Sequence, residues 1–266
     1  MKRVFYCLST LAATVMLFSS CLGSGSNEYT TSSYAVLTTA STYGQPLFYT
    51  YDYPYIVSSP SLTLYPDNDL SGQAYIVNYT FYPDAAENTA ENFKKNGYYT
   101  VTIGDYLKLN TFRCAYYPSA EPEIDAPLEN EIKTTSPATV WTVINGLLFL
   151  QVNYKYIKDQ KSEWYLYTNS SAEPKFDTNK GANIYDIYLR GKFGTTTSSG
   201  QEQSAEMMAF DTKSFLNTLN SRENNAKRTK FYLRLNYPAA SEEDKEVLVW
   251  KPDNSNLMEL RVVSEE

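Results

Sequence analysis

The chain has 266 residues, which is enough for one large domain or two ordinary ones. Its 23 basic and 30 acidic residues give a formal charge of −7, which argues against nucleic-acid binding through phosphate neutralisation and against a polybasic membrane patch. There is no histidine, which excludes Ser-His-Asp and Cys-His catalysis, a histidine general base and histidine-bound zinc.

Residues 1–20 have the layout of a bacterial secretory signal. Lys2 and Arg3 precede an apolar run of roughly 15 residues, shorter than the ~20 residues that span a bilayer. The run ends at Phe18 and is followed by two serines and Cys21. This pattern predicts removal of residues 1–20 and attachment of acyl chains to Cys21, which would anchor the protein to a membrane. A plain secretory signal, cut at a small-residue site, is the alternative.

The cysteines predict no disulfide framework, although export would permit one. Cys7 lies in the predicted signal and Cys21 at the predicted lipid site, so Cys114 remains alone among the three cysteines. Cys114 stands in the sequence Phe-Arg-Cys-Ala and is interpreted as a small buried apolar residue rather than a nucleophile.

The next two segments are expected to be a tether and a first β domain. Residues 21–32 contain a Gly-Ser-Gly-Ser run, which predicts a flexible tether. The 25 tyrosines and the many Thr, Ser and Val residues favour an all-β chain. In residues 33–115, about five strands and a helical turn near residues 90–95 fit a small OB-like closed barrel. The expected strands cover residues 33–41, 47–53, 61–65, 74–82, 98–103 and 107–114.

The predicted strand at residues 47–53 is rich in tyrosine. Its alternation predicts an apolar face and a mixed face. The expected apolar face consists of Leu47, Tyr49, Tyr51 and Tyr53. The expected mixed face consists of Phe48, Thr50 and Asp52. Pro54 follows, as expected at a strand end or a sheet edge.

Residues 116–136 are rich in proline and in acidic residues, a composition that opposes regular structure and predicts an inter-domain linker. A calcium-binding loop is the alternative for so many carboxylates. Their spacing does not match an EF-hand loop, and the central glycine of such a loop is missing. A solvated acidic linker is therefore favoured.

Residues 137–266 predict a second β domain of about seven strands, for which an antiparallel β-sandwich is expected. Asn145-Gly146 between two apolar strands indicates a tight hairpin over residues 139–157. Asp211-Thr212 is expected to cap a short helix that runs to Leu219. Residues 229–236 and 245–250 form the last predicted hairpin, to which residues 257–263 add a further strand. Two faces are expected to be buried: Leu148, Leu150, Val152, Tyr154 and Tyr156, and Phe231, Leu233 and Leu235.

The chain resembles the NigD-like family of bacterial lipoproteins. The resemblance lies in the signal with Cys21, in the segment LFYTYD, and in residues 71–80, where a Gly-Gln turn leads into a Val-Asn-Tyr strand. Residues 136–154 resemble the opening hairpin of the family's C-terminal domain, and residues 231–252 its closing hairpin.

The resemblance implies an N-terminal OB-type domain and a C-terminal, immunoglobulin-like β-sandwich, held at the cell envelope and most consistent with the outer membrane. It also implies a role similar to bacteriocin immunity, with no catalytic residues to carry over. The acidic run that usually follows the lipid cysteine is reduced here to Glu28, so the periplasmic or surface location stays open.

Three functions are compatible with these features. The first is a non-catalytic envelope lipoprotein that binds another protein, without metal or cofactor and without nucleic acid; its oligomeric state does not follow from the sequence. The second is glycan binding through exposed aromatic side chains: Trp164, Tyr49, Tyr51, Tyr53 and Tyr55. The third is a hydrolase that uses two carboxylates, although no acidic residue stands in a distinctive motif.

The aromatic candidates have structural alternatives. Trp141 and Trp250 lie in apolar strands and are expected in the core. Trp164 follows a predicted turn, which makes it a better ligand candidate than the other two tryptophans, although burial in the core is still the favoured interpretation. The tyrosines of residues 49–55 are equally compatible with a half-buried strand face.

Overall fold

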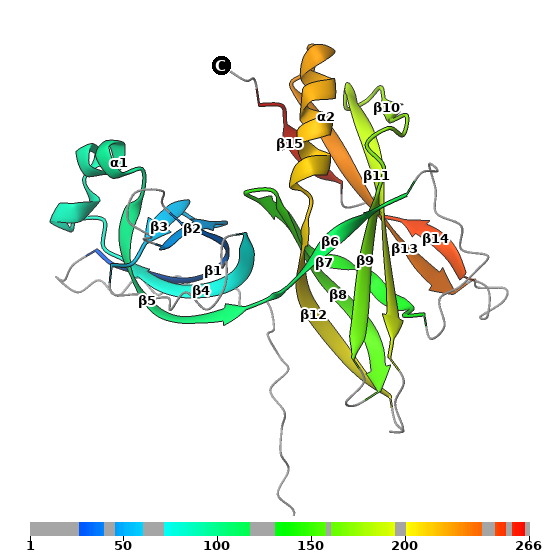
Figure 1. Cartoon of the computed structure of the whole chain (residues 1–266), viewed down its shortest axis with the longest axis horizontal. Helices are drawn as coiled ribbons and strands as arrows, with labels where there is room; N and C mark the ends of the chain where they lie inside the picture. Colours follow the sequence, from blue (N-terminus) through cyan, green and yellow to red (C-terminus); the bar gives the residue numbers. More distant parts are fainter. Residues whose placement is uncertain are drawn as a thin grey trace, which may run out of the picture.

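The computed structural model describes residues 27–39, 46–60, 72–117, 131–157, 161–194, 201–240, 248–253 and 257–263. These residues form a small β-barrel followed by a larger curled sheet (Figure 1), so the expected all-β chain is confirmed. Cys21, the predicted strand at residues 61–65 and most of the predicted linker lie outside the described residues.

The barrel closes in the order β1-β2-β3-β5-β4, with β3 and β5 parallel and the other neighbours antiparallel. Its interior is filled by apolar side chains such as Phe48, Val77 and Phe81. This arrangement confirms the predicted OB-like barrel. Its elements are β1 (Tyr29–Thr39), β2 (Pro46–Thr50), β3 (Ile56–Ser58), β4 (Gln73–Phe81), the 3-10 turn η1 (Ala86–Asn88), α1 (Ala90–Asn96) and β5 (Tyr99–Lys108).

The predicted apolar face of residues 47–53 is wrong in the structure. The positions that β2 buries completely are Pro46, Phe48 and Thr50, whereas Leu47 and Tyr49 are only partly buried. Phe48 fills the barrel interior, and a closed barrel accepts only alternate side chains of a strand. The tyrosines therefore point out of the barrel, which makes them available at its surface.

Two boundaries of the first unit also differ from expectation. β1 begins at Tyr29, inside the predicted tether, because β4 is long enough to pair with it from Phe81 to Gln73. The expected strand at residues 107–114 is divided near Leu109: β5 stays in the barrel, while the following strand joins the second sheet.

The second sheet has the strand order β14-β13-β11-β9-β6-β12-β8-β7, with β10 on β11 and β15 on β13. Its elements are β6 (Asn110–Tyr116), β7 (Thr134–Ile144), β8 (Leu147–Ile157), β9 (Ser162–Thr168), β10 (Lys175–Asp177), β11 (Ala182–Phe193), β12 (Gln201–Asp211), α2 (Lys213–Asn225), β13 (Lys230–Ala240), β14 (Leu248–Pro252) and β15 (Met258–Arg261).

This sheet curls so that its two halves face each other across one apolar core. Leu150 of β8 and Phe210 of β12 belong to the same cluster as Leu166 of β9, Ile187 of β11 and Leu233 of β13. The result is a sandwich, as predicted, but one that is not purely antiparallel. β6 runs parallel to β9 and β12, and β11 runs parallel to β13, because these neighbours are joined by long connections.

Local signals placed the elements of this domain well. Asn145 and Gly146 have φ of 44° and 80°, as a two-residue hairpin turn requires, and join β7 to β8. The predicted helix exists as α2 and is longer than expected. β13 pairs with β14 and β15, as predicted for the last hairpin and the tail. The predicted buried faces are confirmed for Leu148, Leu150, Val152, Tyr154, Phe231, Leu233 and Leu235.

A separate apolar cluster joins the barrel to the second sheet. It combines Val36 and Ala74 of the barrel with Ile144, Phe149 and Ala209 of the second sheet, all of them buried. Across the same contact, the rings of Tyr34 and Phe149 lie 5.8 Å apart. Because close-packed cores transmit position from one element to the next, this cluster fixes the barrel against the β7–β8 hairpin.

Candidate functional site

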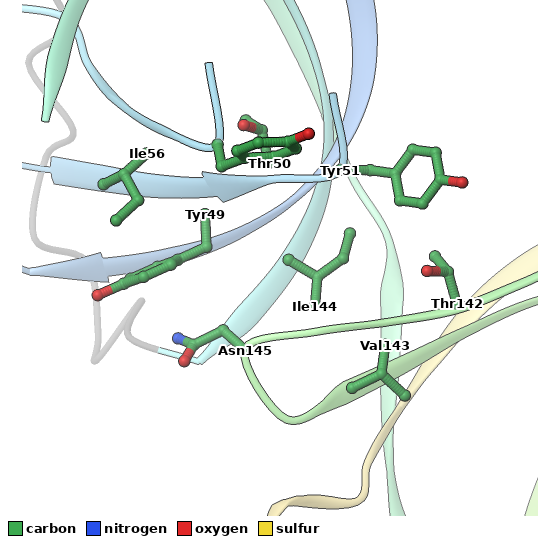
Figure 2. A pocket seen from close by; sticks show the side chains of 9 residues that line it. Tyr49, Thr50, Tyr51, Ile56, Thr142, Val143, Ile144 and Asn145 are labelled. Carbon is green, nitrogen blue, oxygen red and sulfur yellow. The ribbon is translucent and has the colours of Figure 1, made fainter. Parts of the chain in front are cut away.

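A groove of about 390 Å³ lies between the barrel and the β7–β8 hairpin (Figure 2). The barrel contributes residues of β2, of β3 and of the bend between them, at residues 51–55. The hairpin contributes the end of β7 and the first turn residue. The lining residues are Tyr49, Thr50, Tyr51, Tyr55, Ile56, Thr142, Val143, Ile144 and Asn145.

The barrel side of the groove is held by hydrogen bonds within the bend. The backbone N–H of Thr50 donates to the carbonyl of Tyr55 at 2.9 Å, and the Thr50 hydroxyl donates to the carbonyl of Pro54 at 2.6 Å. The N–H of Tyr51 donates to the carbonyl of Tyr34 in β1 at 2.9 Å. Thr50 therefore closes the bend and ends β2, which explains why the strand stops before residue 53.

A second set of contacts ties the bend to the barrel interior. The N–H of Asp52 donates to the Ser33 hydroxyl at 3.0 Å, and the Tyr79 hydroxyl donates to the carbonyl of Tyr53 at 3.4 Å. Burial, followed by the nearby charge of Asp52, raises the pKa of Tyr79 to about 12. The phenol of Tyr79 therefore keeps its proton at neutral pH and remains a donor to the bend.

The hairpin side of the groove is equally constrained. Thr212, which precedes α2, donates its hydroxyl and its N–H to the carbonyl of Gly146, at 2.9 and 3.0 Å. This differs from the predicted role of Thr212 as a side-chain cap, which it does not perform; Asp211 instead accepts from the N–H of Lys213 at 3.1 Å. The turn is thus hydrogen-bonded to the residue that immediately precedes α2.

The groove has an apolar floor and an aromatic, polar rim. Ile144 is buried in the core shared by the domains, and Tyr49 packs against that core. Tyr51 and Tyr55 are 54% and 63% exposed, and Asn145 is exposed as well. Figure 2 shows Ile144 and Asn145 of the hairpin opposite Tyr49 and Tyr51 of the barrel.

The rim carries hydrogen-bonding groups but no charge. None of the nine lining residues is Asp, Glu, Lys or Arg. Among the described residues, no hydrogen-bond partner exists for the Asn145 amide or for the hydroxyls of Tyr51 and Tyr55. These groups are free to bond to a ligand, while the fixed backbone on both sides keeps them in place.

The predicted tyrosines divide between two surfaces. Tyr49, Tyr51 and Tyr55 line the groove; Tyr51 and Tyr55 are exposed, whereas Tyr49 is partly buried. Tyr53 does not line the groove; it is 59% exposed and packs with Phe81 and Tyr99, with ring centroids 5.8 and 6.0 Å away. Its ring also meets that of Tyr55 edge-on at 6.0 Å, so the two surfaces adjoin. The hairpin residues of the groove were missed, because the Asn-Gly signal predicts a turn but not what the turn lies against.

Trp164 does not present a face to ligands, and this candidate is corrected. Its side chain is only 3% exposed, its ring packs edge-on against Tyr154 at 5.3 Å, and its Nε1 donates to Glu206 at 3.1 Å. The turn before Trp164 suggested exposure, but the pleat of β9 directs this side chain into the sandwich. Trp141 packs against the same core, and Trp250 packs on Tyr188 at 4.9 Å.

The carboxylates near the core are occupied by neighbouring donors. Glu206 accepts hydrogen bonds from Tyr154 at 2.7 Å, from Ser162 at 2.7 Å and from Trp164. Glu131 pairs with Arg190, and both side chains are buried. Over the part of the chain that the structure describes, no group of three His, Cys, Asp or Glu residues could hold a metal ion.

Cys114 matches the expectation of a packed apolar residue. It is partly buried against the main core. Burial, followed by the charge of Asp211, raises the pKa of its thiol to about 12. The thiol is therefore protonated at neutral pH, whereas a cysteine nucleophile needs the thiolate.

Comparison with known proteins supports the lipoprotein resemblance and the fold. Residues 25–107 match the lipoprotein OB domain family. An uncharacterized protein from Parabacteroides merdae ATCC 43184 superimposes with a TM-score of 0.70 and 20% identity, over 88% of this chain and 100% of that one. A candidate lipoprotein from Bacteroides fragilis NCTC 9343 superimposes with a TM-score of 0.50 and 11% identity, over 90% of this chain and 100% of that one.

A NigD-like immunity protein from Bacteroides caccae ATCC 43185 is also similar, with a TM-score of 0.43 and 8% identity over 88% of this chain and 97% of that one. No curated protein matches the chain. The two neighbours from Parabacteroides merdae and Bacteroides fragilis, with TM-scores of 0.70 and 0.50, support the fold and nothing beyond it. The predicted resemblance to a family of lipoproteins with an N-terminal OB-type domain is thus confirmed by the match of residues 25–107 to the lipoprotein OB domain.

Proposed function

We propose that this protein is a non-catalytic, lipid-anchored protein of the cell envelope that binds its target through the groove between barrel and hairpin. The observation that carries the proposal is the groove itself: an apolar floor, exposed tyrosines and free polar groups, held on both sides by fixed backbone. Pockets of this composition are the usual binding sites of proteins.

The chemistry of the groove favours binding over catalysis. General acid–base catalysis needs a titratable group within reach of the reacting atoms, most often His, Asp, Glu or Lys, and the groove lining contains none of these; its titratable side chains are the phenols of Tyr49, Tyr51 and Tyr55. The carboxylates of Glu206 and Glu131 are engaged by other side chains. A carboxylate-dependent hydrolase, the third hypothesis from the sequence, therefore gains no support at this site.

The anchor rests on the sequence pattern around Cys21 and on the match to a lipoprotein domain. No helix in the described part of the chain is long and apolar enough to cross a membrane. Two or three acyl chains would hold the protein firmly, because each buried CH2 contributes ~0.8 kcal/mol. The outer membrane is the proposed location.

The anchor is tested by fractionating cells that express the wild-type protein or Cys21→Ser. We expect the wild-type protein in membranes and the variant in the soluble fraction, with radiolabelled palmitate incorporated only into the wild type. Membrane association that survives the substitution would contradict the anchor. Protease treatment of intact cells then distinguishes the surface from the periplasmic face.

The binding role is tested by photo-crosslinking in intact envelopes from a cross-linker placed at residue 51. We expect a defined adduct that is lost when Tyr55 is replaced by alanine and retained when the remote, exposed Tyr116 is replaced. An adduct insensitive to Tyr55→Ala would contradict the groove as the site. Immunity against a bacteriocin, implied by the family resemblance, requires that the adduct contain a protein toxin or its target.

A further inference from the structure

We propose that the groove binds a neutral saccharide, with a sugar ring lying against Tyr51 or Tyr55 and its hydroxyls bonded to the rim. This inference rests on the proposed binding function and names the class of its ligand. Three properties of the groove lead to it: absence of charge in the lining, exposed aromatic faces, and unpartnered neutral polar groups.

The absence of charge in the lining selects against ionic ligands. One residue in five of the chain is charged, yet all nine lining residues are neutral. A carboxylate, phosphate or ammonium group buried here would lose hydration without meeting an opposite charge, which is costly. The ligand is therefore uncharged where it contacts the groove.

The aromatic residues provide flat surfaces at the rim. Tyr51 and Tyr55 are more than half exposed although their backbone is fixed by hydrogen bonds. The negative face of an aromatic ring attracts the weakly positive C–H groups that line one face of a sugar ring. Because the bend is already ordered, such stacking costs little conformational entropy on binding.

The free polar groups exclude a purely apolar ligand. The Asn145 amide can both donate and accept, and so can the hydroxyls of Tyr51 and Tyr55. A hydrocarbon seated in the groove would cover these groups and leave them unpaired, at a cost for each one. A ligand with an apolar face and many neutral hydroxyls satisfies both parts of the groove, and a saccharide has this composition.

The size of the groove suits a short saccharide. Its volume of about 390 Å³ lies at the lower end of the range of small-molecule sites. The site is formed by both domains, and the core that joins them includes Ile144 of the groove floor. Neither domain alone would present it.

The test is a glycan array that holds matched neutral and acidic glycans, followed by calorimetry with the best neutral ligand. The full-length acylated protein is used, in a detergent without a sugar headgroup, since an alkyl glycoside would compete for the groove. We expect neutral glycans to bind and acidic ones not to bind. Replacement of Tyr51 or Tyr55 by alanine should weaken the neutral ligand about tenfold or more, a loss of at least about 1.4 kcal/mol.

Two further variants separate stacking, hydrogen bonding and folding. Asn145→Gly is compatible with the positive φ of the turn and removes the side chain with its amide, so we expect weaker binding with a change in stability of at most about 1 kcal/mol. Tyr116→Ala removes an equally exposed ring on β6, 64% exposed, and should leave binding unchanged. Unfolding curves of all variants identify any that fail to fold.

Failure of this inference is distinguishable from failure of the proposed function. If no neutral glycan binds, or if acidic glycans bind better, the inference that the ligand is a neutral saccharide is overturned. A cross-link from residue 51 that depends on Tyr55 would still support the groove as a binding site. If neutral glycans bind equally well to the Tyr51→Ala, Tyr55→Ala double variant, the groove is not the site and the inference is overturned as well.

Discussion

The groove and the buried polar cluster around Glu223 use similar residues to opposite effect. Glu223 lies on the buried face of α2 and is fully buried; it accepts hydrogen bonds from Asn183 at 2.8 Å and from Tyr185 at 2.5 Å and pairs with Arg228 at 3.3 Å. In the groove, Asn145, Tyr51 and Tyr55 have exposed side chains with no such hydrogen-bond partners among the described residues.

This difference separates structure from function in a tyrosine-rich chain. A buried tyrosine or asparagine must find a partner, because an unpaired polar group away from water is costly. In the second domain these partners are internal, so Tyr185 and Asn183 stabilise the fold. In the groove the partners have to come from outside the protein, so the same residue types are available for recognition.

The largest expected loss of stability follows from breaking the hydrogen-bonded cluster around Glu223. Glu223→Ala leaves Arg228, Tyr185 and Asn183 without their shared acceptor, and we expect the free energy of unfolding to fall by about 3–5 kcal/mol. Chemical denaturation measures this change. Glu173→Ala, which removes an exposed partner of Arg222, is the control and should cost at most about 1 kcal/mol. Equal losses in the two variants would contradict the comparison.

The next effect concerns the packing that buries Trp164. Gly191→Ala would place a Cβ 2.7 Å from the Trp164 ring and 3.0 Å from Ile132, so we expect a loss of about 1–3 kcal/mol from overpacking. At Gly194 a Cβ would lie no closer than 3.6 Å to the Lys161 carbonyl, which makes Gly194→Ala a matched control. If both substitutions leave the thermal midpoint unchanged, Trp164 is less tightly enclosed than the structure indicates.

A smaller effect is expected at the turn that carries the hairpin side of the groove. Gly146 has φ of 80°, and a Cβ there would lie 3.0 Å from the Cβ of Lys213. Gly146→Ala should cost about 1–2 kcal/mol from the left-handed backbone alone, plus the contact with Lys213. Gly72→Ala, at φ of 76° with nothing within 4 Å, measures the backbone effect by itself. In urea unfolding, we expect Gly146→Ala to lower the free energy of unfolding more than Gly72→Ala does.

The smallest effect on stability is expected in the groove. Tyr51→Ala and Tyr55→Ala remove exposed rings without unpairing any polar group of the described residues, so we expect changes within about 0.5 kcal/mol. Thermal unfolding followed by circular dichroism measures them. A loss as large as that of Glu223→Ala would mean that these tyrosines support the fold and would remove the contrast between the two regions.

Elements with a strong local signal could be predicted from the sequence. The Asn145-Gly146 hairpin, the alternating face of β8 and the buried face of β13 depend on turn chemistry and on a period of two residues. The helix α2 was predicted because apolar residues recur at helical spacing after Asp211. For these elements, the residues that define the structure lie close together in the chain.

The errors concern partners that are distant in the chain. The strand at residues 107–114 has one continuous β pattern, and only its pairing assigns β6 to the second sheet. The faces of β2 were reversed because leucine and tyrosine suit either a barrel interior or a packed outer surface. Trp164 was named as a ligand candidate because it follows a turn, although burial in the core was favoured for it, and its burial depends on contacts with β8, β11 and β12.

The sequence by itself determined the all-β class, the absence of histidine chemistry and the tight hairpin, because composition and short-range patterns are sufficient for these. The anchor at Cys21 stays a prediction from the same kind of pattern. Only the tertiary structure decided which tyrosines are exposed and that the bend at residues 51–55 lies against the β7–β8 turn. The physical reason is that the groove depends on a core shared by segments far apart in the chain, and no local pattern of residues records that contact.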